Sequence, residues 1–210
     1  MISALTDESL MDAPTRNRQV QVRKAAMHDI QPILDLINSY AAKGIMLPRT
    51  EFELSENIRD FSVAYAGDTL IGCGALHFYS PMIGEVRSLA VSPDHRTHGV
   101  GMLLVDFLVE EARTYDLGAL FAFTYVPVFF GKMGFHEVER GELPLKAWKD
   151  CLRCPKFNSC DEIAVVRVLS PERWSLHHAS QQVDGLEFAD PILIQLPTIK
   201  PSPNPIIPIK

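Results

Sequence analysis

The segment VSPDHRTHGVGMLL, residues 91–104, places an arginine, two histidines and two glycines between two apolar runs. A strand, a glycine-containing loop and a long helix can direct backbone N–H groups at an anion, because the first amides of a helix lack intrahelical partners. Gly99 and Gly101 leave room for a phosphate, and Arg96 and His98 add local positive charge. The spacing matches neither G-x-x-x-x-G-K-[ST] nor G-x-G-x-x-G. A tight strand-to-helix turn with incidental glycines is the alternative.

The segment CLRCPKFNSC, residues 151–160, has the cysteine spacing C-x2-C-x5-C. A structural zinc site normally takes four ligands from two spaced pairs, so three cysteines are an incomplete signal. His136, Cys73 or a partner chain could supply a fourth ligand. Ordinary thiols are the favoured interpretation, a redox or substrate-lining role is a further alternative, and we expect no bound metal.

Apolar periodicity predicts the elements that must position these residues. The clearest helix begins at Val100, directly after the loop, and ends near Gly118. Thr50 and Glu53 form an S/T-x-x-E capping signature for another helix. Imperfect alternation over 84–91 is typical of a central strand or a bulge. The predicted order is a strand over 19–25, helices over 27–44 and 51–59, strands over 61–65, 69–79 and 84–91, a helix over 100–118, a strand over 119–126, a short helix over 127–132, and closing strands over 135–140 and 162–169.

This order predicts one α/β domain over residues 19–169, with a mixed central sheet flanked by helices. Residues 1–18 are polar without periodicity, and we interpret them as a loose N-terminal arm. Residues 170–210 form a C-terminal extension. Its last part, 191–210, carries six prolines, each of which prevents a regular helix or central strand. The isoleucine and leucine content there favours docking on a surface over full solvation.

Composition narrows the classes of function. Hydrophobic residues make up 47% of the chain and charged residues 22%, as in ordinary globular proteins. The net charge is −6, so no global positive field favours nucleic acid, and an anionic ligand needs a local site. No apolar run approaches the ~20 residues of a membrane span, and the N-terminus lacks the pattern of a signal peptide. We therefore expect a cytoplasmic protein with neither a nucleic acid nor a membrane as partner.

Two motifs resemble a known superfamily. LAVSPDHRTHGVGMLLVDFLVEEA (89–112) resembles the acetyl-CoA-binding motif of the GCN5-related N-acetyltransferases, and FFGKMGFHEV (129–138) resembles a later motif of theirs. The predicted order of elements matches that fold over about 20–169. The resemblance implies acetyl-CoA as cosubstrate, its pyrophosphate held by loop amides and its pantetheine arm paired with a strand. The implied cofactor-binding residues are Leu89, Ala90, Val91, Arg96, Thr97, His98, Gly99, Val100, Gly101, Phe130 and Lys132.

A finer resemblance concerns the acceptor. GIMLPR (44–49), IGCGALHFY (71–79) and GEVRSLAVSPDHR (84–96) resemble the acetyltransferase domain of bacterial N-acetylglutamate synthases. The cysteine-rich segment over 143–166 is similar to a short, single-domain form without the amino-acid-kinase-like regulatory domain. This resemblance implies transfer of the acetyl group from acetyl-CoA to L-glutamate, the first step of arginine biosynthesis.

The implied chemistry needs a general base, because an α-amino group is mostly protonated at neutral pH. The family places its base at the position of Glu85; an exposed carboxylate at a strand start is the alternative. Phe130 stands where many members carry a tyrosine that protonates the departing thiolate. Thr124, which matches a strand-end hydroxyl of the glutamate-specific members, or Tyr125 could take that role, and a structural role for either hydroxyl is the alternative. A thiol with a pKa near ~8.5 also leaves tolerably without an acid.

A dicarboxylate acceptor needs cations and backbone donors. Arg49 matches the family's substrate-binding arginine, whose planar fork suits a carboxylate, and Leu47 offers main-chain contact. Arg87 is a further nearby cation. The longer enzymes hold substrate with an arginine and a serine before the last strand, where this chain reads CPKFNSC, so Lys156, Asn158 or Ser159 would replace them. This departure keeps glutamine, aspartate or another amino acid open as acceptor.

Three functions are therefore weighed. The first is an N-acetyltransferase that makes N-acetylglutamate, the second an N-acetyltransferase for another small amine or amino acid, and the third a non-catalytic module that binds acetyl-CoA. Each takes a small molecule as partner. A homodimer stays open.

Overall fold

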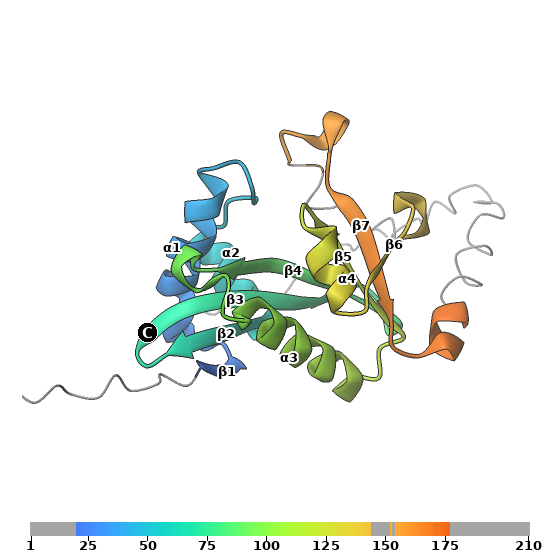
Figure 1. Cartoon of the computed structure of the whole chain (residues 1–210), viewed down its shortest axis with the longest axis horizontal. Coiled ribbons are helices and arrows are strands. Elements are labelled where there is room, and N and C mark those ends of the chain that lie inside the picture. Colours follow the sequence, from blue (N-terminus) through green and yellow to red (C-terminus); the bar gives the residue numbers. More distant parts are fainter. Residues whose placement is uncertain (1–19, 144–151, 153, 177–210) are drawn as a thin grey trace, which may run out of the picture.

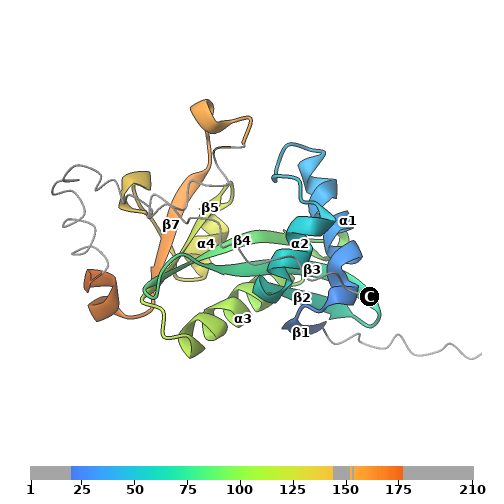
Figure 2. The same ribbon diagram turned by 180° about the vertical axis from the view of Figure 1, so that it is seen from behind.

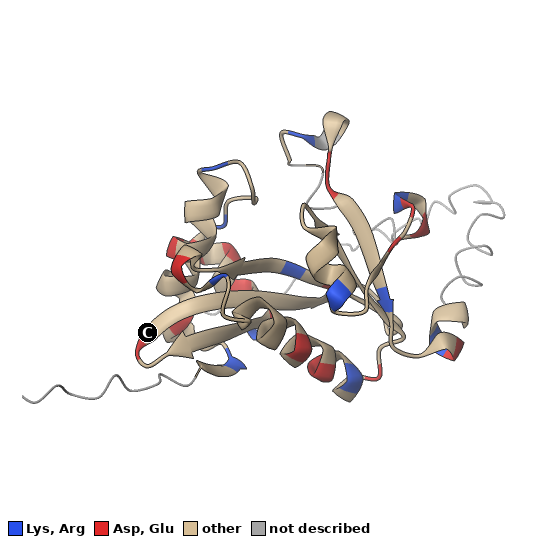
Figure 3. Cartoon of the chain, in the orientation of Figure 1, with Lys and Arg blue, Asp and Glu red and all other residues tan. Residues whose placement is uncertain are grey.

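The computed structural model describes residues 20–143, 152 and 154–176 of the chain (Figure 1). The predicted arm over 1–18 and the greater part of the predicted extension lie outside the described residues. Figure 3 shows Lys and Arg distributed over helices, strands and loops, interspersed with Asp and Glu. Within the described part of the chain, no helix combines the length and apolarity that a bilayer span requires.

Seven strands form a single sheet in the order β1-β2-β3-β4-β5-β7-β6. β4 and β5 run parallel and the other neighbouring pairs are antiparallel, which confirms the predicted mixed sheet. The parallel pair exists because a long helix crosses over between its two strands. The strands are β1 Val20–Lys24, β2 Phe61–Ala66, β3 Thr69–Phe78, β4 Ile83–Val91, β5 Ala119–Thr124, β6 His136–Glu137 and β7 Ile163–Val168.

Helices cover both faces of the sheet. Figure 1 shows α3 in front of the strands, and Figure 2, from behind, shows α1 and α2 in front of them. The predicted Thr50 cap is confirmed: the Glu53 N–H donates to Thr50 Oγ1 at 3.2 Å, and the Thr50 N–H donates to Glu53 Oε2 at 2.9 Å. The α-helices are α1 Ile30–Ala41, α2 Glu51–Asn57, α3 Val100–Thr114 and α4 Pro127–Lys132. The short 3-10 turns are η1 Met27–Asp29, η2 Ile58–Asp60, η3 Pro93–His95, η4 Arg140–Glu142 and η7 Phe157–Ser159.

Alternation along the strands divides the core between the two faces. On one face, Leu76 and Val86 pack with Leu108 of α3. On the other face, Ala75 packs with Ile33 of α1. Each fully buried aliphatic side chain of this kind stabilises the fold by about 1.5–3 kcal/mol. The face of any β4 residue therefore follows from its register.

A buried carboxylate fixes the first strand. Asp29 is fully buried and accepts two bonds from Arg23 at 2.7 and 2.9 Å, one from the Ala26 N–H at 2.7 Å and one from the Tyr65 hydroxyl at 2.8 Å. Burial by itself would raise the pKa of Asp29, but these bonds outweigh it and lower the pKa to about 2. The carboxylate thus joins β1, η1 and β2.

The chain continues to pack against the domain after β7. Residues 171–176 are helical. Arg173 donates to the Asp116 carbonyl and, at 2.5 Å, to its carboxylate. The Ser170 N–H donates to the Gly118 carbonyl at 2.9 Å, and Trp174 packs against the cluster that contains Phe121. The start of the predicted extension therefore contacts the sheet.

Candidate active site

β4 and β5 separate partway along their length. They pair only through Ile83–Glu85 and Ala119–Phe121. Beyond these pairs β4 continues along β3 to Val91, and β5 continues along β7 (Figure 1). The far half of β4 thus presents one row of backbone groups without partners in β5, where an extended ligand can bind as an added strand.

β4 also carries a bulge. Its register with β3 shifts between Cys73 and Ala75, and opposite this shift Ser88 has a φ of 53°. A non-glycine residue at positive φ is uncommon and is found where the surrounding structure over-determines it. The irregularity predicted over 84–91 is therefore confirmed as a bulge in a central strand. It lies beside the gap, at the start of the segment Leu89–Val91.

Glu85 lies at the last pair between β4 and β5. Its neighbours in the sheet are His77 of β3 and Phe121 of β5, and it is 9% exposed. The Tyr79 hydroxyl donates to Glu85 Oε2 at 2.9 Å. Glu85 is therefore a buried, hydrogen-bonded carboxylate at the mouth of the gap, and the alternative of an exposed strand-start carboxylate is wrong.

Arg87 shares the face of Glu85, two residues along β4. It is largely buried, and its guanidinium lies 3.6 Å from the Asp60 carboxylate. The same carboxylate oxygen lies 2.7 Å from His77 Nδ1. Asp60, which had no predicted role, thus contacts both Arg87, a predicted substrate-binding residue, and His77, the strand neighbour of Glu85.

The predicted anion loop leads into α3. Gly99, at a φ of 76°, is the residue before the helix. It has no side chain that could accept a hydrogen bond from the first N–H groups of the helix. The first backbone bond of the helix runs from the Leu103 N–H to the Gly99 carbonyl at 3.0 Å. The N–H groups of Val100, Gly101 and Met102 come before that bond, at the positive end of the helix dipole. Arg96, Thr97 and His98 are exposed beside them.

The close approach at Gly101 has a clear partner. A Cβ atom at this position would lie 3.3 Å from the ring of Phe129. Phe130, the predicted cofactor-binding residue, is 4% exposed, and its ring packs edge-on against Phe129 and Phe135 in the core. The aromatic residue that lies against the loop is thus Phe129. Lys132 is exposed at the end of α4.

Tyr40 of α1 connects the loop to β4. Its hydroxyl donates to the Val91 carbonyl at 2.5 Å and accepts from Arg96 at 2.8 and 3.2 Å. The Arg96 guanidinium also lies over the Tyr40 ring, 5.1 Å from its centroid. Tyr40 had no predicted role, because its helical spacing is that of a core residue.

The two candidate hydroxyls lie at the end of β5. Thr124 is 5% exposed and pairs with Ile163, which packs against the α3 cluster, so its side chain lies on the face opposite to that of Glu85. Thr124 Oγ1 accepts from the Val126 N–H at 3.0 Å, a bond that uses a lone pair and keeps the O–H. Tyr125 is 38% exposed.

Lys156 contacts Tyr125 and Asp161. Its ammonium donates to the Tyr125 hydroxyl at 3.2 Å, lies 4.9 Å from the ring centroid, and lies 3.4 Å from the Asp161 carboxylate. Burial raises the pKa of Tyr125 although the Lys156 hydrogen bond opposes it, so the phenol stays protonated at neutral pH. Asn158 is exposed in η7.

Asn38 of α1 holds the backbone of Arg49. The Asn38 amide donates to the Arg49 carbonyl and accepts from the Arg49 N–H, each at 3.0 Å. Leu47 and Arg49 are half-buried in the segment between α1 and α2. Asn38 is a third residue without a predicted role, after Asp60 and Tyr40; α1 carries other polar residues, so its sequence did not mark this one.

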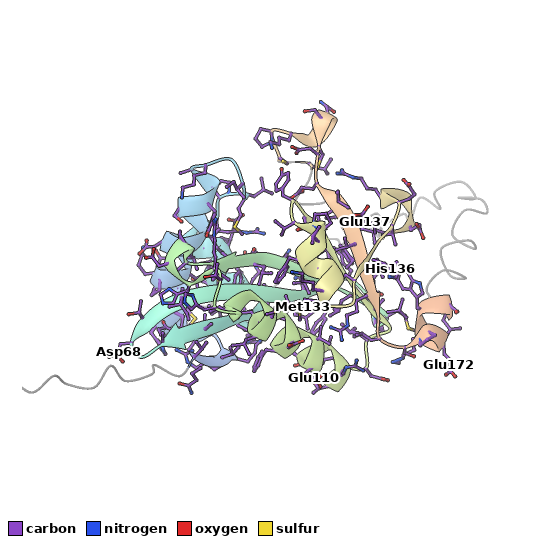
Figure 4. All side chains as sticks on the ribbon, in the orientation of Figure 1. Asp68, Glu110, Met133, His136, Glu137 and Glu172 are labelled. Atoms are coloured by element: carbon purple, nitrogen blue, oxygen red, sulfur yellow. The ribbon has the colours of Figure 1, made fainter. Side chains whose placement is uncertain are left out.

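The cysteines are spread over the fold. Cys73 is buried against α1, and burial raises the pKa of its thiol to about 12. Cys160 accepts from Arg140 at 3.2 Å. His136 lies on β6, the edge strand (Figure 4). Cys151 lies outside the described residues. Among the described residues, no three His, Cys, Asp or Glu side chains group to hold a metal.

The structure thus joins the predicted residues into two sets. Leu89–Val91 and the loop 96–101 are continuous and are tied together by Tyr40. Glu85 and Arg87 of β4 lie on the same face of the sheet as His77 of β3. The gap, the bulge and the helix amides fit an extended thioester cofactor with a diphosphate, because the unpaired backbone edge of β4 leads through the exposed loop to the first amides of α3.

Comparison with known proteins gives the family. Residues 29–141 match the model of the acetyltransferase (GNAT) family. An uncharacterised N-acetyltransferase of Chlorobaculum tepidum is 40% identical over 148 residues, which are 70% of this chain and 96% of that protein. An amino-acid acetyltransferase of Mycobacterium tuberculosis is 38% identical over 121 residues, 56% of this chain and 69% of that protein.

A solved structure agrees with these relatives. The N-acetylglutamate synthase of Neisseria gonorrhoeae, complexed with coenzyme A and N-acetyl-glutamate, superposes with a TM-score of 0.66 at 32% identity. The match covers 72% of this chain and 35% of that one. The mixed sheet described above is thus the sheet of an acetyltransferase domain. The chain belongs to the acetyltransferase (GNAT) family, an acyltransferase family that uses acetyl-CoA.

Proposed function

We propose that the protein is an L-glutamate N-acetyltransferase, which makes N-acetylglutamate for arginine biosynthesis in the cytoplasm. The observation that carries the catalytic part is the buried Glu85 carboxylate at the last β4–β5 pair, where the strands part. Two findings support the acceptor: the amino-acid acetyltransferase at 38% identity, and the structural match that holds coenzyme A with N-acetyl-glutamate.

The reaction in this proposal is a direct transfer. The neutral amine of the acceptor attacks the thioester carbonyl carbon, so a C–N bond forms while the C–S bond breaks. Glu85 takes the proton that the amine loses. The thiolate leaves and takes up one proton, from Thr124, Tyr125 or water. Glu85 and Thr124 lie on opposite faces of the sheet, which suits a reaction in which proton removal and thiolate departure occur on opposite sides of the gap.

Substrate binding in this proposal follows the same division. The amides at the start of α3 hold the diphosphate, with Arg96 and His98 beside them, and the β4 backbone at Leu89–Val91 holds the pantetheine arm. Arg49, whose backbone Asn38 fixes, binds an acceptor carboxylate.

One observation favours a second candidate, an acetyltransferase for a different amino acid. The two other predicted substrate cations already face carboxylates: Arg87 faces Asp60, and Lys156 faces Asp161. A second carboxylate on the acceptor would have to share these partners. An acceptor with a neutral side chain, such as glutamine, avoids that competition.

The deciding experiment is acetyl-CoA turnover across the twenty amino acids. The acetylated products are best measured by mass spectrometry, because the chain's own thiols react with the usual thiol reagents. We expect kcat/KM for L-glutamate to exceed that for glutamine and aspartate at least tenfold. The same assay with Glu85→Gln gives the rate of product formation without the proposed base. Preference for another amino acid supports the second candidate, and coenzyme binding without any product supports a non-catalytic module.

A further inference from the structure

Tyr79 lies where it can control the proposed base. Its hydroxyl donates to Glu85 Oε2 at 2.9 Å. Its ring packs edge-on against His77, with centroids 5.1 Å apart, and lies tilted against Phe121, with centroids 5.5 Å apart. His77 and Phe121 are the two residues that flank Glu85 in the sheet, one on β3 and the other on β5. The tyrosine thus contacts the carboxylate and both of its neighbours.

The Tyr79 ring is held in place by His77, which in turn contacts Asp60. His77 Nδ1 lies 2.7 Å from Asp60 Oδ2, and Arg87 lies 3.6 Å from the same oxygen. Because Asp60 fixes His77 and His77 packs on Tyr79, the direction of the hydroxyl is set by the fold. This matters because a glutamate has three rotatable side-chain bonds, and a base must meet its proton within hydrogen-bond reach.

From this arrangement we infer that Tyr79 is the positioning residue of the reaction: it holds the Glu85 carboxylate in one orientation and keeps it ionised by donating a hydrogen bond to it. The inference rests on the proposed function, in which Glu85 is the base. The bond occupies one acceptor position of a carboxylate that has about four, so it orients the group without consuming its capacity to accept a proton.

Titratable and charged groups from several elements lie on the side of the sheet that carries Glu85. The Tyr79 hydroxyl, just after β3, donates to it, His77 of β3 pairs with it, and Arg87 of β4 shares its face. Asp60 of η2 faces both His77 and Arg87. Tyr79→Phe removes only the hydroxyl and keeps the ring between His77 and Phe121. A donated bond favours the ionised carboxylate, so its loss moves protonation of Glu85 to higher pH.

The test is a direct titration by NMR of protein labelled with 13C at the glutamate carboxyl carbons, with the Glu85 signal assigned by its loss in Glu85→Gln. In Tyr79→Phe we expect the midpoint of that signal to rise by about one pH unit. Tyr65→Phe is the matched control, because it removes a tyrosine bond to another buried carboxylate, that of Asp29. It should leave the Glu85 midpoint unchanged.

Kinetics provide a second readout. Tyr79→Phe should lower kcat at neutral pH about three- to tenfold and move the acidic limb upward by the same unit, with the KM for acetyl-CoA within twofold. An unchanged midpoint in folded Tyr79→Phe overturns the inference. If that variant does not fold, 3-fluorotyrosine at position 79, a stronger donor, must lower the midpoint instead, and an unchanged value overturns the inference equally. Absence of turnover with every amino acid refutes the proposed function, while the NMR midpoint still decides the role of Tyr79.

Discussion

Glu85 and Phe121 form the last residue pair between β4 and β5. On one side of this pair the sheet is continuous; on the other the strands part, and the bulge at Ser88 follows three residues later. The pair places a buried carboxylate at the point where the two strands separate. In the proposed reaction, this position in the register places the base beside the strand edge that is proposed to hold the thioester.

Glu85→Gln tests this position. The amide keeps the shape of the side chain but cannot accept the proton, so kcat should fall at least tenfold and the acidic limb of the pH profile should disappear. Glu137→Gln on β6, an exposed position at the sheet edge (Figure 4), is the matched control and should leave kcat unchanged. Steady-state kinetics across pH measure both variants. An unchanged kcat in Glu85→Gln would remove this residue from the role.

Arg49→Ala tests the acceptor site. Loss of the guanidinium removes a bidentate partner for a carboxylate, so the KM for glutamate should rise at least tenfold while that for acetyl-CoA stays within twofold. Because Asn38 binds the Arg49 backbone, the alanine keeps the local chain path. Arg113→Ala on α3 is the control for removing a surface arginine. Equal changes in both KM values would contradict the assignment.

The fold was accessible from sequence because its signals are local. The capping pair Thr50 and Glu53, the apolar spacing of α3 and the irregular alternation of β4 each appear in the structure where the pattern indicated. Each signal depends on residues within a few positions of one another. The order of elements along the chain also followed from such local patterns, and it matches the fold that the motif resemblance implied.

The site was accessible only in part, because its contacts join residues far apart in sequence. Tyr40 and Val91 are bonded across 51 positions, and no spacing rule brings them together. Asp60 reaches His77 and Arg87 by packing of η2 against the sheet. Phe130 was predicted at the cofactor by its motif position, yet helix α4 turns that ring into the core and presents Phe129 to the loop.

Tyr40→Phe tests the link between β4 and the anion loop. The hydroxyl joins the Val91 carbonyl to Arg96, so its loss should loosen both parts of the proposed coenzyme site. The KM for acetyl-CoA should rise about three- to tenfold, with that for the acceptor within twofold. Tyr115→Phe, at an exposed position after α3, is the control. A larger effect on the acceptor than on the coenzyme would contradict this role.

Asp29→Asn tests the buried ion pair through pH. The pKa of Asp29 is lowered from 3.8 to about 2, so its contribution to stability is fully present above pH 4 and is lost as pH falls toward 2. That shift corresponds to about 2 kcal/mol of unfolding free energy. The variant should be less stable by at least this amount at pH 7, and the difference should shrink near pH 2.5.

Urea denaturation at both pH values measures this difference. Asp68→Asn, in the exposed turn between β2 and β3 (Figure 4), is the control and should show neither effect. A loss of stability of the same size at both pH values would mean that the ion pair contributes through packing and not through charge.

Truncation tests where the folded domain ends. The chain 1–176 keeps Trp174 against the Phe121 cluster and Arg173 on Asp116, whereas the chain 1–169 loses both. Removing a partly buried tryptophan and its helical turn should cost about 1–3 kcal/mol, so 1–169 should melt about 3–10 °C below the full chain. The chain 1–176 should match the full chain in Tm and in acetyl-CoA turnover, as expected if the remaining residues form a separate extension. Equal melting of 1–169 and the full chain would show that residues 170–176 contribute nothing to the fold, and lost activity in 1–176 would assign the later residues to the working enzyme.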